Sequence, residues 1–162
     1  MPESDQKKVY DLVKSFDTGM LATFGGTNQL HVRPMAVAQL EESMRIWFMT
    51  SAQSLKAQDL EANPRAELIF QSGSAYVVLS GAAQLSRSPS KLDEVWKDIY
   101  KVWFPKGKAD PDIALVSFDP NRAEYWDQTG AQKLKFLFES AKAFLTGEKA
   151  RDNGEQHKKV AL

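Results

Sequence analysis

The sequence has 162 residues and equal numbers of basic and acidic side chains, 21 of each, so its formal net charge is zero. This balance excludes the strongly basic surface typical of nucleic-acid-binding proteins. The absence of cysteine excludes disulfides, thiolate catalysis and cysteine-ligated metal centres. The sequence has only two histidines, His31 and His157, and we expect no metal site.

The length and the 43% hydrophobic content predict one soluble globular domain. The N-terminal stretch is polar, and no run approaches the ~18 apolar residues of a membrane-spanning helix. We therefore expect a cytoplasmic protein without membrane or nucleic-acid partners. We expect residues 1–147 to form this domain, including a C-terminal helix, and residues 148–162 to form a mobile polar tail.

In chain order, apolar residues at helical spacing first predict a helix over residues 4–16. An antiparallel meander follows, with predicted strands over residues 20–24, 31–40 and 44–50. Pro34 lies inside the second strand and indicates an edge, a bulge or the opening of a site. The sequence leaves two interpretations of Arg33 beside it. Its guanidinium either presents a planar donor to a phosphate or carboxylate ligand, or it is exposed at the edge or forms a salt bridge.

The stretch from Ile46 to Phe70 predicts a strand, a polar turn, a short helix, an Asn–Pro break and a strand. Hydroxyl and amide side chains gather at the start of this helix, with Lys56 in its first turn. The free N–H groups and the positive dipole end of a helix suit an anion such as a phosphate. The alternative is that Ser54 only caps the helix and that Lys56 is solvated.

The second half of the chain predicts further strands over residues 65–71, 75–85, 113–118 and 122–127, with a turn over 119–121 and a helix over 131–146 ended by Gly147. Side chains alternate along residues 65–71 as in a strand with one buried face. Gly81 indicates a bulge or a close backbone approach. Trp103 and Phe104, adjacent in a loop, are candidates for a ligand wall, a subunit contact or a cap on an open barrel end. These short strands predict a mainly β fold, an antiparallel barrel of six to seven strands with flanking helices.

Several motifs follow one another in an order that is typical of one family. They are Leu30–Met35, Trp47–Ser51, Ser54–Lys56, Asn63–Pro64, Tyr76–Gly81, Leu92–Trp96, Trp103–Gly107, Asp110–Pro111 and Ala123–Trp126. Together they cover about Val9 to Asp127. The chain resembles the pyridoxamine 5′-phosphate oxidase-like superfamily of FMN-binding split β-barrels, and most closely its bacterial general stress protein branch.

The resemblance implies a split barrel that forms a homodimer, with FMN or FAD bound at the subunit interface. Three residues would hold the phosphate, beside the helix start at Ser54: Arg33, Ser51 and Lys56. Four residues would line the ring and the ribityl chain: Pro34, Met35, Met49 and Thr50. Three residues would reach the ring from the partner subunit: Gln71, Trp103 and Trp126.

The true oxidases of this superfamily end in an Arg-Leu-x-Pro segment whose arginine contributes to binding the pyridoxal substrate. This chain has no such segment, so we expect no pyridoxamine 5′-phosphate oxidase activity. No side chain stands out as an acid, base or nucleophile, and we nominate no catalytic residue.

The leading hypothesis is a flavin-binding general stress protein with a redox, carrier or sensor role and an unknown redox partner. The alternative is an FMN-dependent oxidoreductase of unknown substrate, either a flavin reductase or a pyridoxamine 5′-phosphate oxidase-like enzyme, whose substrate stacks near Trp103 and Phe104. A third hypothesis is a module for another planar cofactor, haem or deazaflavin, with His31 as the candidate axial ligand of haem.

Overall fold

A computed structural model of the chain describes residues 3–128, 130–147 and 157–162. The helical elements are α1 (Glu3–Lys14), α2 (Leu55–Ala62), α3 (Pro89–Val95), η1 (Asp98–Val102), η2 (Gly107–Ala109) and α4 (Gly130–Thr146). The strands are β1 (Thr18–Phe24), β2 (Leu30–Ala36), β3 (Gln39–Leu40), β4 (Ile46–Ser51), β5 (Arg65–Gln71), β6 (Ala75–Ser86), β7 (Ile113–Asp127) and β8 (His157–Ala161).

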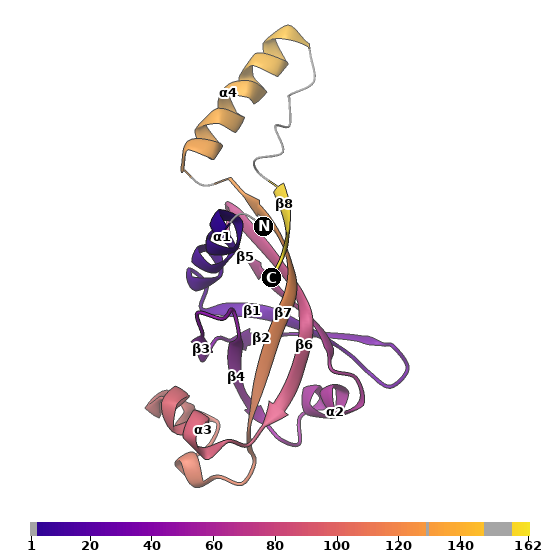
Figure 1. Ribbon diagram of the computed structural model, residues 1–162, viewed down its shortest axis with the longest axis vertical. Coiled ribbons are helices and arrows are strands. Elements are labelled where there is room, and N and C mark those ends of the chain that lie inside the picture. Colours follow the sequence, from indigo (N-terminus) through magenta and orange to yellow (C-terminus); the bar gives the residue numbers. More distant parts are fainter. Residues whose placement is uncertain (1–2, 129, 148–156) are drawn as a thin grey trace.

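The strands of the described residues form one antiparallel sheet in the order β2-β1-β5-β6-β7-β4-β3, and β8 also pairs with β7. The long strand β7 pairs with β6 along one edge, while its other edge pairs with β4 and then with β8. The sheet curls, so that β2 and β4 come into contact without a shared ladder (Figure 1). The predicted fold class, a β-rich split barrel with flanking helices, is confirmed.

Alternating side chains explain why the sheet encloses a core. In β5, Ala66, Leu68 and Phe70 are fully buried, while the residues between them are more exposed, as the alternation predicted. Phe48 of β4 and Phe118 of β7 are likewise buried. The apolar face of α1 packs on the same core through residues 9, 12 and 13. The curl of the sheet therefore follows from apolar residues on one face.

Pro34 lies in β2, which is an end strand of the sheet, and it faces Met20 of β1. The interpretation of Pro34 as an edge residue is therefore confirmed. The predicted bulge at Gly81 is also confirmed, because the register between β6 and β7 shifts between Ser80 and Gly81. A Cβ atom on Gly81 would lie 2.1 Å from the carbonyl oxygen of Asp119, so only glycine fits there.

The strand opposite this bulge differs from the prediction. The Asp119–Asn121 segment was expected to be a turn between two strands, but residues 113–127 form the single 15-residue strand β7. Pro120, which cannot donate to a ladder, lies opposite Gly81 at the bulge. The predicted strand over residues 31–40 is instead divided, because β2 ends at Ala36 and β3 begins at Gln39.

The C-terminal end of the predicted mobile tail is a strand instead. Residues 157–161 form β8, which pairs with residues 122–126 of β7, and Val160 is buried in the core. The ring of His157 stacks on Trp126 with centroids 4.6 Å apart. The tail prediction is therefore wrong for this segment, while residues 148–156 lie outside the described residues.

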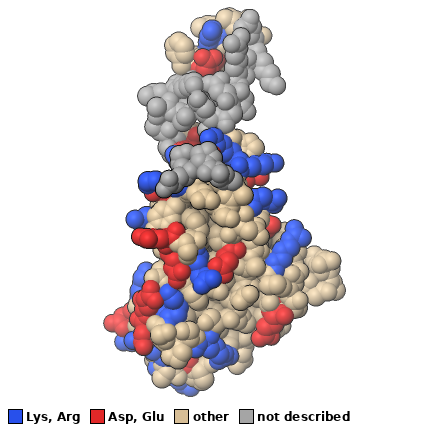
Figure 2. Space-filling view, viewed as in Figure 1, with Lys and Arg blue, Asp and Glu red and all other residues tan. Residues whose placement is uncertain are grey.

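The predicted C-terminal helix is present as α4, which projects beyond the end of the sheet (Figure 1). It ends at Gly147, whose φ of 71° suits glycine, and the Gly147 N–H donates to the Ala143 carbonyl at 2.9 Å. Basic and acidic side chains are interspersed over the face in Figure 2. Within the described ranges, every helix is too short or too polar to cross a bilayer.

Candidate functional site

A hollow of about 430 Å³ opens where the ends of β2 and β4 meet the first turn of α2 and the loop after η1. We call it the Lys56 pocket. Its lining residues are Pro34, Met35, Ala36, Met49, Thr50, Ser51, Lys56, Tyr100, Trp103, Phe104 and Asp112. The contact between β2 and β4, which share no ladder, brings its two sides together.

The start of α2 positions the polar side of the Lys56 pocket. Ser54 caps the helix, as predicted, because its Oγ accepts a hydrogen bond from the Ala57 N–H at 3.3 Å. The Ser54 Oγ also lies 3.2 Å from Oγ1 of Thr50, the buried residue near the end of β4. Lys56 Nζ donates to the same Thr50 oxygen at 3.0 Å. This bond holds the ammonium group over the end of β4 instead of leaving it in bulk solvent.

Arg33 is held by a second group of polar residues on the inner side of the sheet. We call Thr23, His31, Arg33 and Asp59 the Asp59 cluster. Arg33 Nη1 donates to Thr23 Oγ1 at 2.6 Å, and Thr23 Oγ1 donates to Asp59 Oδ2 at 2.7 Å. His31 Nδ1 and Arg33 Nη2 lie 2.8 Å and 3.4 Å from the same carboxylate oxygen. A helix residue, Asp59, thus fixes side chains from β1 and β2.

The charges of these residues influence one another. Burial by itself raises the pKa of Asp59, but hydrogen bonds from Thr23 and His31, with the charges of His31 and Arg33, bring that pKa below its usual value. Burial lowers the pKa of Arg33, and Asp59 opposes this effect. Burial also lowers the pKa of Lys56, and the nearby positive charge of Arg33 lowers it further.

The two cations are therefore close enough to repel each other. Asp59 compensates Arg33, but no ion pair joins Lys56 to a carboxylate in the part of the chain that the structure describes. A partly buried cation without a counter-ion is costly, and an anionic ligand would remove that cost. The polar end of the pocket is thus suited to a phosphate or carboxylate.

The other side of the Lys56 pocket is apolar and aromatic. Tyr100 and Phe104 are buried and pack with Met49. Trp103, between them in sequence, is 66% exposed although it lines the pocket. A hollow with a lysine at one end, a second cation beside that lysine, and flat apolar walls at the other end suits a planar ring system that carries an anionic group.

Asp112 supplies a further polar group to this hollow. Its Oδ1 is buried and accepts no hydrogen bond from any described residue. A buried acceptor without a partner is unusual, because its desolvation is not offset. A ligand hydroxyl or N–H in the pocket would satisfy this oxygen, so the lining fits a ligand with donors between its ring and its anionic group.

Most residues of the predicted site come together in this pocket. Those that line it are Pro34, Met35, Met49, Thr50, Ser51, Lys56 and Trp103. Arg33 and Ser54 do not line it but are neighbours of Lys56 and Thr50. Trp103 was expected to come from a partner subunit, whereas the structure places it on the pocket of its own chain. The contact of all these side chains with a cofactor stays a prediction.

Gln71 and Trp126 lie elsewhere in the chain. The registers pair Gln71 with Tyr76 and Tyr76 with Trp126, so these side chains form one row across the outer face of the sheet. Neither residue lines the Lys56 pocket of its own chain. Their approach to a flavin from a second subunit, which the resemblance implies, stays a prediction.

Sequence reasoning missed Thr23, Asp59, Tyr100 and Asp112. For Asp59, the available signal was an acidic residue directly before the apolar Leu60 in the predicted short helix. His31, the candidate haem ligand, belongs to the Asp59 cluster and does not line the Lys56 pocket. Among the described residues, no group of three His, Cys, Asp or Glu side chains is arranged to hold a metal ion.

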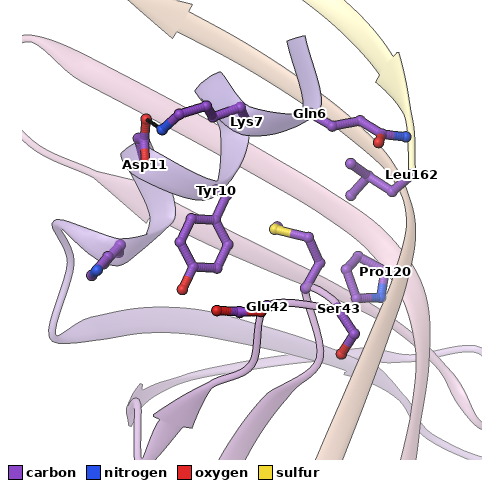
Figure 3. Close-up of a pocket in the computed structure, with 10 residues that line it drawn as sticks. Gln6, Lys7, Tyr10, Asp11, Glu42, Ser43, Pro120 and Leu162 are labelled. Atoms are coloured by element: carbon purple, nitrogen blue, oxygen red, sulfur yellow. Dashed lines mark hydrogen bonds and ion pairs between the residues drawn. The ribbon is translucent and has the colours of Figure 1, made fainter. Parts of the chain in front are cut away.

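A second hollow, of about 650 Å³, lies beside α1 (Figure 3). We call it the α1 cleft. Its lining residues are Gln6, Lys7, Tyr10, Asp11, Lys14, Glu42, Ser43, Met44, Pro120 and Leu162. Lys7 Nζ pairs with Asp11 Oδ2 at 2.7 Å, on the same helix. The α1 cleft contains none of the residues predicted to bind a cofactor.

The chain is similar to proteins of one family. A family model described as "Pyridoxamine 5'-phosphate oxidase like" matches residues 4–152. General stress protein 26 of Bacillus subtilis (strain 168) is 28% identical over 120 residues, which cover 71% of this chain and 83% of that protein.

Two solved structures extend this similarity. A crystal structure described as general stress protein 26 from Jannaschia sp. CCS1 is 30% identical with a TM-score of 0.76, and the match covers 98% of this chain and 99% of that one. The general stress FMN/FAD binding protein from Xanthomonas citri is 29% identical with a TM-score of 0.67, and the match covers 78% of this chain and 90% of that one. Because the family model matches nearly the whole sequence, the chain belongs to the pyridoxamine 5′-phosphate oxidase-like family.

Proposed function

We propose that this protein is a flavin-binding general stress protein that holds FMN or FAD in the Lys56 pocket. The observation that carries the proposal is a hollow that combines Lys56, whose charge is felt by the neighbouring cation Arg33, with an apolar and aromatic wall. The similarity to a general stress FMN/FAD binding protein supports it. A bound flavin would supply the redox chemistry, and the chain would supply position and charge.

The phosphate of the flavin is assigned to the polar end of the pocket. Arg33 and Lys56 would balance its charge, and Ser51, with the cap at Ser54, would add donors at the start of α2. The ring and the ribityl chain are assigned to Pro34, Met35, Met49 and Thr50, with Trp103 at the mouth. The unsatisfied Oδ1 of Asp112 would accept from a ribityl hydroxyl or a ring N–H.

The proposal includes a homodimer that completes this site. The outer face of the sheet exposes Met20, Val32 and Tyr76, which are 40%, 46% and 41% exposed. Pro34 belongs to this face, because it pairs with Met20, and it also lines the Lys56 pocket. A second copy on this face would cover the apolar residues, and its Gln71 and Trp126 would reach the edge of the pocket.

The oligomeric state tests this part of the proposal. We expect Val32→Glu to dissociate the dimer, measured by analytical ultracentrifugation, and to weaken flavin binding with it. Phe144→Glu is the control, because Phe144 is 89% exposed and belongs to α4, the helix that projects beyond the end of the sheet (Figure 1). A dimer lost only in Phe144→Glu would place the interface on α4 instead.

A redox or carrier role without pyridoxamine 5′-phosphate oxidase activity remains our leading proposal. The titratable lining residues are Lys56, Tyr100 and Asp112, and burial raises the pKa of Tyr100, so this phenol is a weak acid in the pocket. The second candidate function is an FMN-dependent reductase, favoured by the exposed Trp103 and Val102 beside the mouth, where a flat substrate could stack. Bleaching of bound flavin by NADH or NADPH without oxygen would support this reductase, and no bleaching with either would exclude it.

The binding proposal is tested by the absorption spectrum of the protein after incubation with FMN and desalting. We expect retained flavin bands in the wild-type protein and their loss in Arg33→Ala and Lys56→Ala. Lys7→Ala is the matched control, because it removes a lysine from the α1 cleft. A wild-type protein that retains no flavin at micromolar concentration would contradict the proposal, as would equal loss in all three variants.

A further inference from the structure

The buried carboxylate of Asp59 is unexpected beside an anion-binding site. Its side chain is 4% exposed and lies next to Arg33, one of the two cations assigned to the phosphate. A negative charge at this position repels a phosphate, most strongly where water is excluded. Its presence therefore needs an explanation other than charge balance.

The hydrogen bonds of the Asp59 cluster fix the guanidinium of Arg33 at several points. Thr23 Oγ1 accepts from Arg33 Nη1 at 2.6 Å, so its single proton is directed to Asp59 Oδ2 at 2.7 Å. Arg33 Nη1 also reaches the Leu21 carbonyl at 3.4 Å, and Nη2 reaches Asp59 at 3.4 Å. Within the described ranges, Nε of Arg33 donates to no protein acceptor, so part of the guanidinium fork is left for a ligand.

The same arrangement leaves Lys56 without a carboxylate partner among the residues that the structure describes. Asp59 Oδ2 is shared by Thr23, His31 and Arg33, while Lys56 Nζ donates to the neutral hydroxyl of Thr50. Asp59 thus orients one cation without pairing with the other. The positive charge of Lys56 stays available to an anion in the pocket.

We propose that Asp59, acting through Thr23, is a positioning residue that orients Arg33 toward the phosphate of the flavin. This inference rests on the proposed function. A preorganised guanidinium loses less conformational freedom on binding, and it presents its free donors to phosphate in a fixed geometry. Asp59 touches no part of the ligand in this account and acts only through Arg33.

Positioning of Arg33 and simple charge repulsion predict opposite changes in FMN affinity when Asp59 is substituted. If Asp59 acted only as a nearby negative charge, Asp59→Asn would tighten FMN binding. If Asp59 positions Arg33, the same substitution weakens FMN binding, because the neutral amide holds the guanidinium less firmly. Riboflavin, which has the same ring and ribityl chain without phosphate, separates this effect from damage to the rest of the pocket.

The experiment measures dissociation constants of FMN and riboflavin by quenching of flavin fluorescence. We expect Asp59→Asn to weaken FMN by about tenfold, the size of one charge-assisted hydrogen bond, and to change riboflavin by less than about twofold. In an Arg33→Ala background, Asp59→Asn should cause no further loss of FMN affinity. Asp119→Asn is the matched control, since Asp119 accepts from Arg45 Nε at 2.7 Å outside the pocket.

A second pair of variants tests the same contact without changing charge. Thr23→Val removes the hydroxyl between Arg33 and Asp59, and Thr23→Ser keeps it. We expect Thr23→Val to weaken FMN selectively and Thr23→Ser to restore the wild-type value. Equal losses in both variants would show a packing effect and overturn the inference.

The remaining outcomes are also distinguishable. Unchanged or tighter FMN binding in Asp59→Asn overturns the inference and leaves the proposed function intact. An equal loss of riboflavin, or a further loss in the Arg33→Ala background, overturns it as well. A wild-type protein that binds neither flavin overturns both the proposed function and this inference.

Discussion

The Lys56 pocket and the α1 cleft both contain lysine, but they differ in how its charge is balanced. In the α1 cleft, Lys7 pairs with Asp11 at 2.7 Å, and Lys14 lies 5.9 Å from the ring centroid of Tyr10 (Figure 3). In the Lys56 pocket, the hydroxyl of Thr50 is the only hydrogen-bond acceptor of Lys56 Nζ within the described ranges, and the positive charge of Arg33 repels this lysine.

Size alone would select the other hollow. The α1 cleft is the larger of the two, at about 650 Å³ against about 430 Å³. Its two lysines, Lys7 and Lys14, are exposed to solvent, and its aromatic residue Tyr10 is only half-buried. The exposed ion pair of Lys7 with Asp11 is of the kind that contributes little to stability. An unbalanced, partly buried charge therefore indicates a ligand better than volume does.

The largest expected effect comes from removing both cations of the Lys56 pocket. The double variant Arg33→Ala/Lys56→Ala should weaken FMN binding by about 100-fold or more, since a hydrogen bond to a charged group contributes about 1.5–3 kcal/mol. Titration of flavin fluorescence gives the value. Riboflavin binding should change far less, and a parallel loss of both ligands would contradict a phosphate site at this end.

The cap of α2 provides a smaller and more selective test. Ser54→Ala should cost about 1 kcal/mol of unfolding free energy, because the Ala57 N–H loses its acceptor, and it should also weaken FMN binding. Ser88→Ala is the matched control, since Ser88 caps α3 in the same way through the Lys91 N–H. Chemical denaturation should show similar losses for both, while only Ser54→Ala changes FMN affinity.

The pH dependence of FMN binding tests whether the charge of Lys56 contributes to the affinity. The pKa of Lys56 is lowered by burial and by Arg33, so the free protein loses this charge at a lower pH than an exposed lysine does. FMN affinity should therefore fall as pH rises, starting below the ordinary lysine pKa of 10.5. Lys56→Arg should move this fall to higher pH, and riboflavin affinity should not follow it. The same fall for riboflavin would exclude Lys56 as its cause.

The smallest effect belongs to the α1 cleft. Lys7→Ala removes an exposed i,i+4 ion pair and should lower the unfolding free energy by only about 0.3–0.5 kcal/mol, measured by denaturation. FMN binding should be unchanged. A clear loss of FMN in this variant would mean that the larger hollow is the binding site.

Local signals predicted much of the fold and part of the site. The cap at Ser54, the alternation in β5 and the close approach at Gly81 each depend on neighbouring residues, and each is present. The predicted turn at Asp119–Asn121 failed because the turn-like Asp-Pro-Asn sequence is accommodated in a ladder by the bulge opposite Gly81. The local sequence of this segment does not show that β6 pairs with it across the sheet.

The Asp59 cluster could not be predicted either, because local sequence does not report contacts between residues far apart in the chain. Its hydrogen bonds join residues that are 36, 28 and 26 positions apart, and they form only when α2 packs on the curled sheet. The strand β8 was missed because only Val160 of its five residues is buried. Both features depend on long-range pairing, which single-sequence periodicity does not report.

The central claim is that the Lys56 pocket binds a flavin through its phosphate. The most direct measurement is the ratio of the FMN and riboflavin dissociation constants of the wild-type protein, from fluorescence titrations under one set of conditions. The account predicts that FMN binds at least about tenfold more tightly than riboflavin, because only FMN supplies the counter-charge for Arg33 and Lys56. Equal affinities for the two flavins would contradict it.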